Sequence, residues 1–222
     1  MNFAYNLEMA RFYTPQISDF PFHVTGRRHN RAPFDIELDE VWNVMCELLY
    51  LTQRFFDLKI HAFVLMPNHY HLICSSNSVP LGTTIGYFMR ESSKTMNALS
   101  GKVNQNWGSR YYRCEMDVFT YYMNCYKYVY QNPVRAGLTT KCENWKYSTL
   151  HGLLGRSHLL IPVEADTLLF SESGLLQQEN LSWLNQKPNP ENLNSVRAAL
   201  KKVKFKLPKQ NTKAHFLENG LL

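Results

Sequence analysis

Two apolar segments separated by a short turn constrain the fold more than any other feature. The segment "KIHAFVLM" covers 59–66, and "YHLICS" covers 70–75. Both have the length and the apolar content of buried strands, and the dipeptide Pro67–Asn68 between them is typical of a tight turn. The sequence therefore predicts two neighbouring strands joined by a hairpin turn.

The segments around this hairpin alternate between strand and helix patterns. Strands are predicted at 20–27 and within 106–118, and helices at 35–54, 81–99 and 119–132, with a stop at Gly101 and another at Pro133. The order β-α-β-β-α-β followed by a helix is typical of an α+β, ferredoxin-like fold. We expect an antiparallel sheet with helices on one face, then a tyrosine-bearing helix and a basic C-terminal extension.

Composition limits the class of protein. Of the 222 residues, 45% are hydrophobic, which is enough for a core, and the net charge of +6 is compatible with nucleic acid without proving it. The sequence contains no run of 18 apolar residues, so it predicts no membrane span. The first residues lack the pattern of a secretory signal. Five widely spaced cysteines without a CxxC pair favour free thiols in a reducing, cytoplasmic compartment.

A pair of histidines stands at the start of the second strand of the hairpin. Residues i and i+2 of a strand point to the same face, so His69 and His71 should stand side by side while Tyr70 points to the opposite face. Two neutral imidazoles can bind one divalent cation and leave its other positions open for chemistry. A pair of surface histidines at a strand start is the alternative, and the short pattern alone does not decide between them.

The helix at 119–132 carries five tyrosines, and each of them could belong to the core. A phenol with a pKa of about 10 needs help to act as a nucleophile. A polar oxygen four residues ahead would lie on the same helix face. Tyr128 has such a residue, Asn132, whereas Tyr121 has only Asn124 at three residues. Tyr128 is therefore the preferred candidate.

The segments "FVLMPNHYHLI" and "YVYQNPVRAGL" together resemble the single-tyrosine HUH transposases, most closely the REP-associated tyrosine transposases of bacteria. Further similarity lies in "HVTGRRHNR", "FMRESSKTMNALSG", "NWGSRYYRCEM" and "NWKYST". The resemblance covers about residues 20–155, with its motifs in the family's order. The chain departs from the family in having "GRRHNR" at the first loop and Tyr70 between the histidines, which leaves the substrate preference open.

The resemblance implies a metal-dependent endonuclease and strand transferase acting on single-stranded, hairpin-forming DNA such as REP elements. Carried over to this chain, His69 and His71 match the metal-binding pair for Mg²⁺ or Mn²⁺, and Asn132 matches a third, polar ligand. Tyr128 matches the nucleophile that forms a 5′-phosphotyrosine link. The resemblance also implies a DNA-associated bacterial protein.

Basic residues near these motifs are candidate DNA contacts. The candidates are Arg27, Arg28, Arg31, Arg90, Lys94, Arg110, Arg113 and Arg135. The alternatives are a solvated loop for the first three, a half-buried strand for Arg110 and Arg113, and a cap of the preceding helix for Arg135.

We expect a catalytic domain at 1–155 and a C-terminal extension at 156–222. From Asn194 to Lys213 the extension has seven basic residues and no acidic one. Apolar residues at 196, 200, 203 and 207 fall on one helical stripe. This segment is either a solvated amphipathic helix or an arm on a phosphate backbone.

Two other functions are compatible with the sequence. One is a catalytically silent hairpin-binding protein derived from a transposase. The other is a metallohydrolase, which needs a further strong ligand beside the histidines, such as Glu115 or Asp117. The sequence leaves open whether the chain is a monomer or a homodimer.

Overall fold

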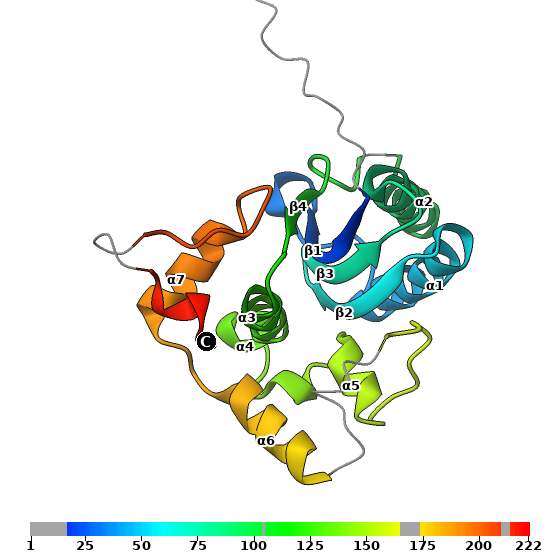
Figure 1. The fold of residues 1–222 in the computed structure, drawn as a ribbon. Coiled ribbons are helices and arrows are strands. Elements are labelled where there is room, and N and C mark those ends of the chain that lie inside the picture. The colour runs from blue at the N-terminus through cyan, green and yellow to red at the C-terminus, as the bar shows by residue number, and fades with distance from the viewer. Residues whose placement is uncertain (1–16, 104, 165–173, 210–213) are drawn as a thin grey trace, which may run out of the picture.

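Four antiparallel strands form one sheet in the order β2-β3-β1-β4, as the computed structural model shows (Figure 1). The structure describes residues 17–103, 105–164, 174–209 and 214–222. Its strands are β1 (Ser18–Arg27), β2 (Lys59–Met66), β3 (His69–Ser76) and β4 (Tyr112–Glu115). Its α-helices are α1 (Leu38–Phe56), α2 (Leu81–Ser100), α3 (Phe119–Tyr130), α4 (Asn132–Arg135), α5 (Thr149–Leu153), α6 (Gly174–Asn185) and α7 (Pro190–Ala199). The predicted α+β, ferredoxin-like arrangement is confirmed.

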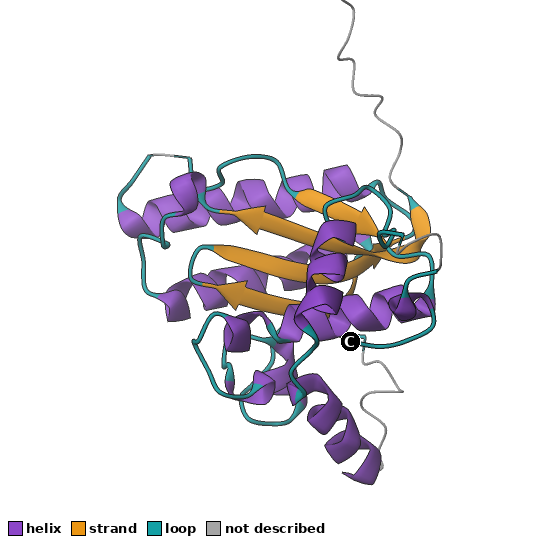
Figure 2. Cartoon of the chain, turned by 90° about the vertical axis from the view of Figure 1, so that its left-hand side faces the viewer, coloured by secondary structure: helices purple, strands orange, loops and turns teal. Residues whose placement is uncertain are grey.

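Helices cover both faces of the sheet (Figures 1 and 2). The two ferredoxin-like helices, α1 and α2, lie together on one face, where they enclose side chains such as Val24, Phe63 and Tyr70. The tyrosine-bearing helix α3 lies on the other face and packs against Val64 and Ile73. Strand side chains alternate between faces, so each residue of β3 belongs either to the α1/α2 side or to the α3 side. Within the described ranges, no helix combines the length and the apolarity needed to cross a membrane.

The helix ends follow local backbone chemistry. Helix α2 ends at Ser100, and Gly101 takes the left-handed conformation (φ 67°) that glycine adopts without strain. Helix α3 ends at Tyr130, two residues earlier than expected. Pro133 then occupies the first turn of α4, where its missing N–H breaks no helical hydrogen bond. The chain therefore remains helical through the proline.

The C-terminal extension packs on the outer side of α3. Leu184, Val196 and Leu217 share a buried cluster with Tyr126 of that helix. A single amphipathic helix through residue 207, one of the two alternatives for this segment, is wrong, because α7 ends at Ala199 and the chain then runs beside β4. There the N–H of Phe205 donates to the carbonyl of Glu115 (2.8 Å). Lys213, the last basic residue of the segment, lies outside the described residues.

Tyr70 fits between the two histidines because glycine stands directly across from it. Gly26 of β1 pairs with Tyr70 of β3, and the buried phenol ring lies over that glycine. A Cβ at position 26 would meet Cε1 of Tyr70 at 2.6 Å, well inside van der Waals contact. The bulky residue between the histidines thus depends on the absence of a side chain at position 26 of the neighbouring strand.

We predict that Gly26→Ala lowers the free energy of unfolding by about 1–3 kcal/mol, because a rigid ring must move to admit one methyl group. Urea denaturation checks this value. Gly86→Ala is the matched control, since nothing lies within 4 Å of a Cβ there and alanine favours a helix. If Gly26→Ala costs as much in a Tyr70→Leu background as in the wild type, the two residues are not coupled and the explanation fails.

Candidate functional site

His69 and His71 lie side by side on the α3 face of the sheet. On β3, His69 pairs with Arg27 of β1, and His71 pairs with Thr25. The two imidazole rings have centroids 5.1 Å apart. Tyr70 between them points to the α1/α2 side and is fully buried. The strand geometry thus puts two potential nitrogen ligands next to each other.

A third histidine, which the sequence motifs did not single out, contacts the pair. His23 of β1 lies on the same face as Thr25 and Arg27. Its Nε2 is 2.9 Å from Nδ1 of His71, and both side chains are buried. The motif "HVTGR" places His23 on the face of Arg27, but its contact with His71 depends on the register between β1 and β3, which the sequence does not specify.

The turn residue Asn68 determines which nitrogen of His69 carries its proton. The Asn68 side-chain amide donates from Nδ2 to the carbonyl of Arg31 (2.6 Å), so its oxygen is the acceptor on the other side. That oxygen lies 2.7 Å from Nδ1 of His69, which must therefore donate. Neutral His69 then has its lone pair on Nε2, the nitrogen left for a ligand.

Burial keeps these imidazoles neutral. It lowers the pKa of His23 to about 4, and burial together with the positive charge of Arg27 lowers the pKa of His69 to about 4. The pKa of His71 falls well below its ordinary value through burial, then through His23 and His69. A histidine whose pKa lies below the working pH is unprotonated, so all three offer lone pairs near pH 7.

The ring of Tyr128 stands edge-on against two of the histidines. Its centroid is 5.9 Å from that of His71 and 6.4 Å from that of His23, with planes nearly perpendicular to both. The rival Tyr121 instead donates to Glu218 and packs against the ring of Phe205. The structure thus brings Tyr128 to the histidines and turns Tyr121 toward the C-terminal extension.

The polar residues after Tyr128 bind the end of its helix. Nδ2 of Asn132 donates to the carbonyl of Tyr128 (3.0 Å), and so does Nη2 of Arg135 (3.0 Å). The Arg135 guanidinium also lies 4.4 Å from the centroid of the Tyr128 ring. Burial lowers its pKa to about 10, which leaves it charged at neutral pH. Arg135 therefore caps the helix and places a positive charge beside the phenol.

The donor atoms suit a cation that brings further oxygen ligands of its own. His69 and His71 can each present Nε2. Among the described residues, no three His, Cys, Asp or Glu side chains group in a way that could hold a metal ion. Glu115 is paired with Lys204 (3.1 Å) and accepts from Ser18. It therefore does not supply the further carboxylate ligand that a metallohydrolase would need beside the histidines. Phosphate, water or an amide such as Asn132 would complete the ligand set, and the role of Asn132 as a ligand stays a prediction.

The candidate DNA contacts fall into different surroundings. Arg27 is exposed beside His69, and exposed Arg31 lies at the loop that Asn68 binds. Arg28 is buried, and its guanidinium donates to the Pro33 carbonyl and pairs with Asp35. Its side chain therefore holds the loop in place rather than facing solvent.

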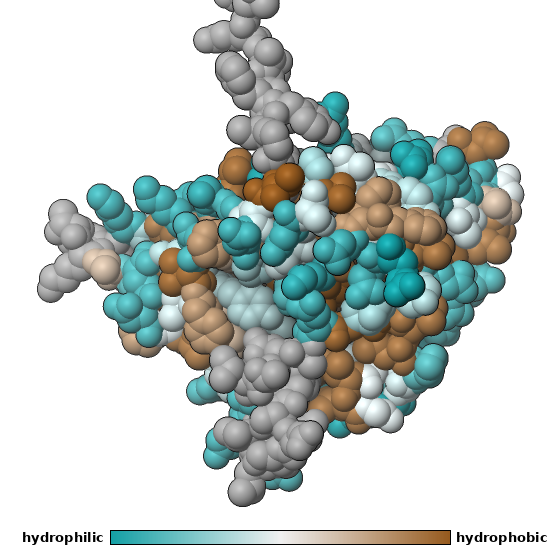
Figure 3. All heavy atoms as spheres, turned by 45° about the vertical axis from the view of Figure 1, so that its right-hand side comes forward, coloured by the Kyte–Doolittle hydropathy of each residue, from teal (hydrophilic) through white to brown (hydrophobic). Residues whose placement is uncertain are grey.

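The other candidates are dispersed. Arg90 and Lys94 lie on α2, on the opposite side of the sheet from α3, and both pair with Glu91. Figure 3 shows the side of α1 and α2, where hydrophilic and hydrophobic residues are interspersed. Arg113 lies over the ring of Phe22, and exposed Arg110 follows the loop that bonds to the Arg27 carbonyl. Arg27 and Arg135 are thus the basic candidates that the structure places beside the histidine pair and Tyr128.

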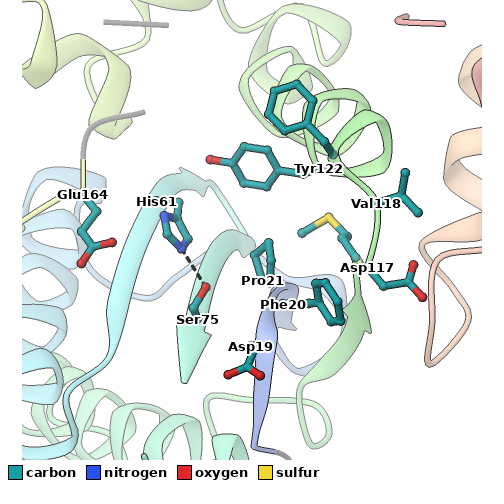
Figure 4. Close-up of a pocket in the computed structure, with 11 residues that line it drawn as sticks. Asp19, Phe20, Pro21, His61, Ser75, Asp117, Val118, Tyr122 and Glu164 are labelled. Atoms are coloured by element: carbon teal, nitrogen blue, oxygen red, sulfur yellow. Dashed lines mark hydrogen bonds between the residues drawn. The ribbon is translucent and has the colours of Figure 1, made fainter. Parts of the chain in front are cut away.

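A cavity of about 480 Å³ opens on the α3 face of the sheet, away from the histidine pair. Figure 4 shows the hydrogen bond between His61 and Ser75 there, with Glu164 on one side and Asp117 on the other. Asp19 adds a third carboxylate to the lining. Carboxylates repel phosphate, so this cavity is a poorer nucleic-acid site than the histidine cluster.

Comparison with solved structures identifies a shared fold. A REP-associated tyrosine transposase bound to a REP hairpin superposes on this chain with a TM-score of 0.55, over 67% of this chain and 87% of that one, at 21% identity. This chain has the same fold. A transposase-like protein from Deinococcus radiodurans R1 also matches, with a TM-score of 0.37 over 60% of this chain and 92% of that one, at 14% identity. No protein-family model and no curated protein matches the chain.

We predict that Arg28→Ala lowers the free energy of unfolding by about 1–3 kcal/mol, because it removes a buried side chain together with its hydrogen bond to the Pro33 carbonyl and its ion pair with Asp35. Its neighbour Arg27 is exposed, and Arg27→Ala should leave stability nearly unchanged. Urea denaturation of both variants checks the contrast. Equal losses would mean that Arg28 does not hold the loop.

Proposed function

We propose that this protein is a metal-dependent single-stranded DNA endonuclease and strand transferase of the transposase type. Its substrate would be hairpin-forming DNA such as a REP element. The contact of the Tyr128 ring with His71, beside His69, is the observation that carries the proposal. The shared fold with a transposase solved on a REP hairpin supports the choice of substrate.

Tyr128 would act as the nucleophile. Its phenol oxygen forms a bond to a backbone phosphorus as the bond from phosphorus to the 3′ oxygen breaks. The phenol loses its proton, and the released 3′ oxygen gains one. The product is a 5′-phosphotyrosine link and a free 3′-OH. Because the phosphodiester energy is kept in that link, a second displacement can join the strand without ATP.

Neighbouring residues suit this chemistry. His69 and His71, with Asn132, would hold Mg²⁺ or Mn²⁺, which when bound polarises a phosphoryl oxygen. The guanidinium of Arg135, 4.4 Å from the centroid of the Tyr128 ring, places a positive charge beside the attacking group, where it can attract the phosphate. Arg27 beside His69 offers a charged donor to the phosphate. Tyrosine and histidines belong to one chain, so one protein molecule contains all of these groups.

An exposed aromatic ring extends the site toward the edge of the sheet. Tyr112 of β4 pairs with Thr25 of β1, which pairs with His71, so all three point to the α3 face. The Tyr112 side chain is 68% exposed. A base stacked on such a ring gains about 1–3 kcal/mol without sequence preference, as single-stranded substrates require.

The five cysteines are buried free thiols, which fits a reducing compartment. We propose that the protein acts on DNA in a bacterial cytoplasm.

We predict that the wild type forms a covalent adduct with a single-stranded hairpin oligonucleotide in Mn²⁺, detected as a shift on a denaturing gel. Tyr128→Phe should abolish the adduct because it removes the attacking oxygen. Tyr121→Phe is the matched control on the same helix and should keep it. His69→Ala and His71→Ala should reduce the adduct while DNA binding persists.

An adduct that survives in Tyr128→Phe would place the nucleophile elsewhere. Tight, salt-sensitive binding with no cleavage in Mg²⁺ or Mn²⁺ would instead indicate the catalytically silent hairpin-binding protein.

We predict that Arg27→Ala weakens single-stranded DNA binding and reduces the salt dependence of log K by about 0.7, the value for one phosphate contact. Arg90→Ala is the control, because Arg90 lies on the far side of the sheet and is paired with Glu91. Fluorescence anisotropy over a salt series measures both. Equal effects of the two substitutions would contradict the location of the DNA surface.

A further inference from the structure

We propose that His23 is a positioning residue that determines which ring nitrogen of neutral His71 carries the proton, and so leaves the other nitrogen for metal binding. The inference rests on the proposed function, since it concerns the cation that His69 and His71 would hold. In this arrangement His71 donates Nδ1–H to Nε2 of His23, and the lone pair of His71 is on Nε2.

The contact between the two histidines is specific. Nε2 of His23 and Nδ1 of His71 are 2.9 Å apart, and the ring planes are within 19° of parallel. His23 is 4% exposed and His71 6%. The rings come from neighbouring strands, whose backbone pairing holds them in place. A bond between buried groups on a rigid sheet orients a ring more firmly than a bond to solvent can.

Counting protons limits the arrangement to two forms. A neutral imidazole carries one N–H, so either His71 donates to His23 or His23 donates to His71. In the second form the proton of His71 is on Nε2, which then has no lone pair for a cation. Metal binding therefore selects the first form, in which His23 is the acceptor.

His69 is fixed in the same form by a different neighbour. Asn68 accepts from its Nδ1–H, and the bond from Asn68 to the Arg31 carbonyl prevents the amide from exchanging its roles. Both histidines of the pair thus have Nδ1 bound to a protein partner and Nε2 left over. Such outer partners orient metal-binding histidines, and their loss costs about 10–100-fold in metal affinity.

His23 is not itself placed as a third ligand. Its Nε2 is taken by the bond to His71, and the Tyr128 ring stands edge-on beside it. The absence of any three-residue metal group among the described side chains agrees with this role.

The test is Mn²⁺ affinity without DNA, measured from the free Mn²⁺ signal in electron paramagnetic resonance. His23→Phe keeps a buried ring but removes the acceptor, and it should weaken binding by about 10–100-fold. His23→Gln places an amide oxygen near the position of Nε2 and should bind within about threefold of the wild type. His61→Phe is the control, because His61 bonds Ser75 on the same face outside the pair and should bind as the wild type does.

Nitrogen NMR of the Mg²⁺-saturated wild type gives an independent readout that needs no variant to fold. It should show the proton of His71 on Nδ1, and a proton on Nε2 would overturn the proposal. A folded His23→Phe that binds Mn²⁺ as the wild type does, or a His23→Gln as weak as His23→Phe, would also overturn it. With either of these two variant results the proposed function stands, whereas a proton on Nε2 of His71 would also exclude that nitrogen as a metal ligand. A wild type that binds no Mn²⁺ would overturn both the proposed metal site and the role of His23.

Discussion

The backbone pairing of β1 with β3 is the constraint on which the site depends. It sets His23, Thr25 and Arg27 in one row beside the row that carries His71 and His69. A strand has a side-chain period of two, so a slip of one residue would turn every one of these groups to the α1/α2 side. The apolar side chains of β1 and β3 that face α1 and α2 oppose such a slip, because burying histidines in their place is unfavourable. The core on one face of the sheet thus keeps the register of the site on the other.

Helix α3 is held from its outer side by the C-terminal extension. Nζ of Lys127, a fully buried lysine one residue before Tyr128, donates to the carbonyl of Leu222 (2.7 Å), and Asn124 bonds the carbonyl of Gly220. At the end of the helix, Asn132 and Arg135 bond the carbonyl of Tyr128. These bonds fix the rotation of the helix about its axis, which decides which of its five tyrosines faces the sheet. The extension therefore contributes to the position of the tyrosine even though it lies away from the histidines.

The sequence predicts the local features well and the long-range ones poorly. The strand limits of β2 and the stop at Gly101 follow from short-range patterns. The four-residue spacing to Asn132 favours Tyr128, yet the structure shows the Asn132 amide bonded back to the helix end. The sequence does not predict the role of His23, because its contact with His71 depends on the register between β1 and β3. The sequence does not separate Arg28 from Arg27, since the ion pair of Arg28 with Asp35 depends on the path of the loop. The single helix through residue 207 failed because edge pairing with β4 takes that segment instead.

On the α3 face of the sheet, we propose that a single divalent cation lies beside both the histidine pair and Tyr128. An anomalous difference map from a crystal soaked in Mn²⁺ tests it most directly. We expect a peak within bonding distance of Nε2 of both His69 and His71, with the Tyr128 side chain facing it. A peak in the acidic cavity around Asp19 and Asp117 instead, or none at saturating Mn²⁺, would contradict it.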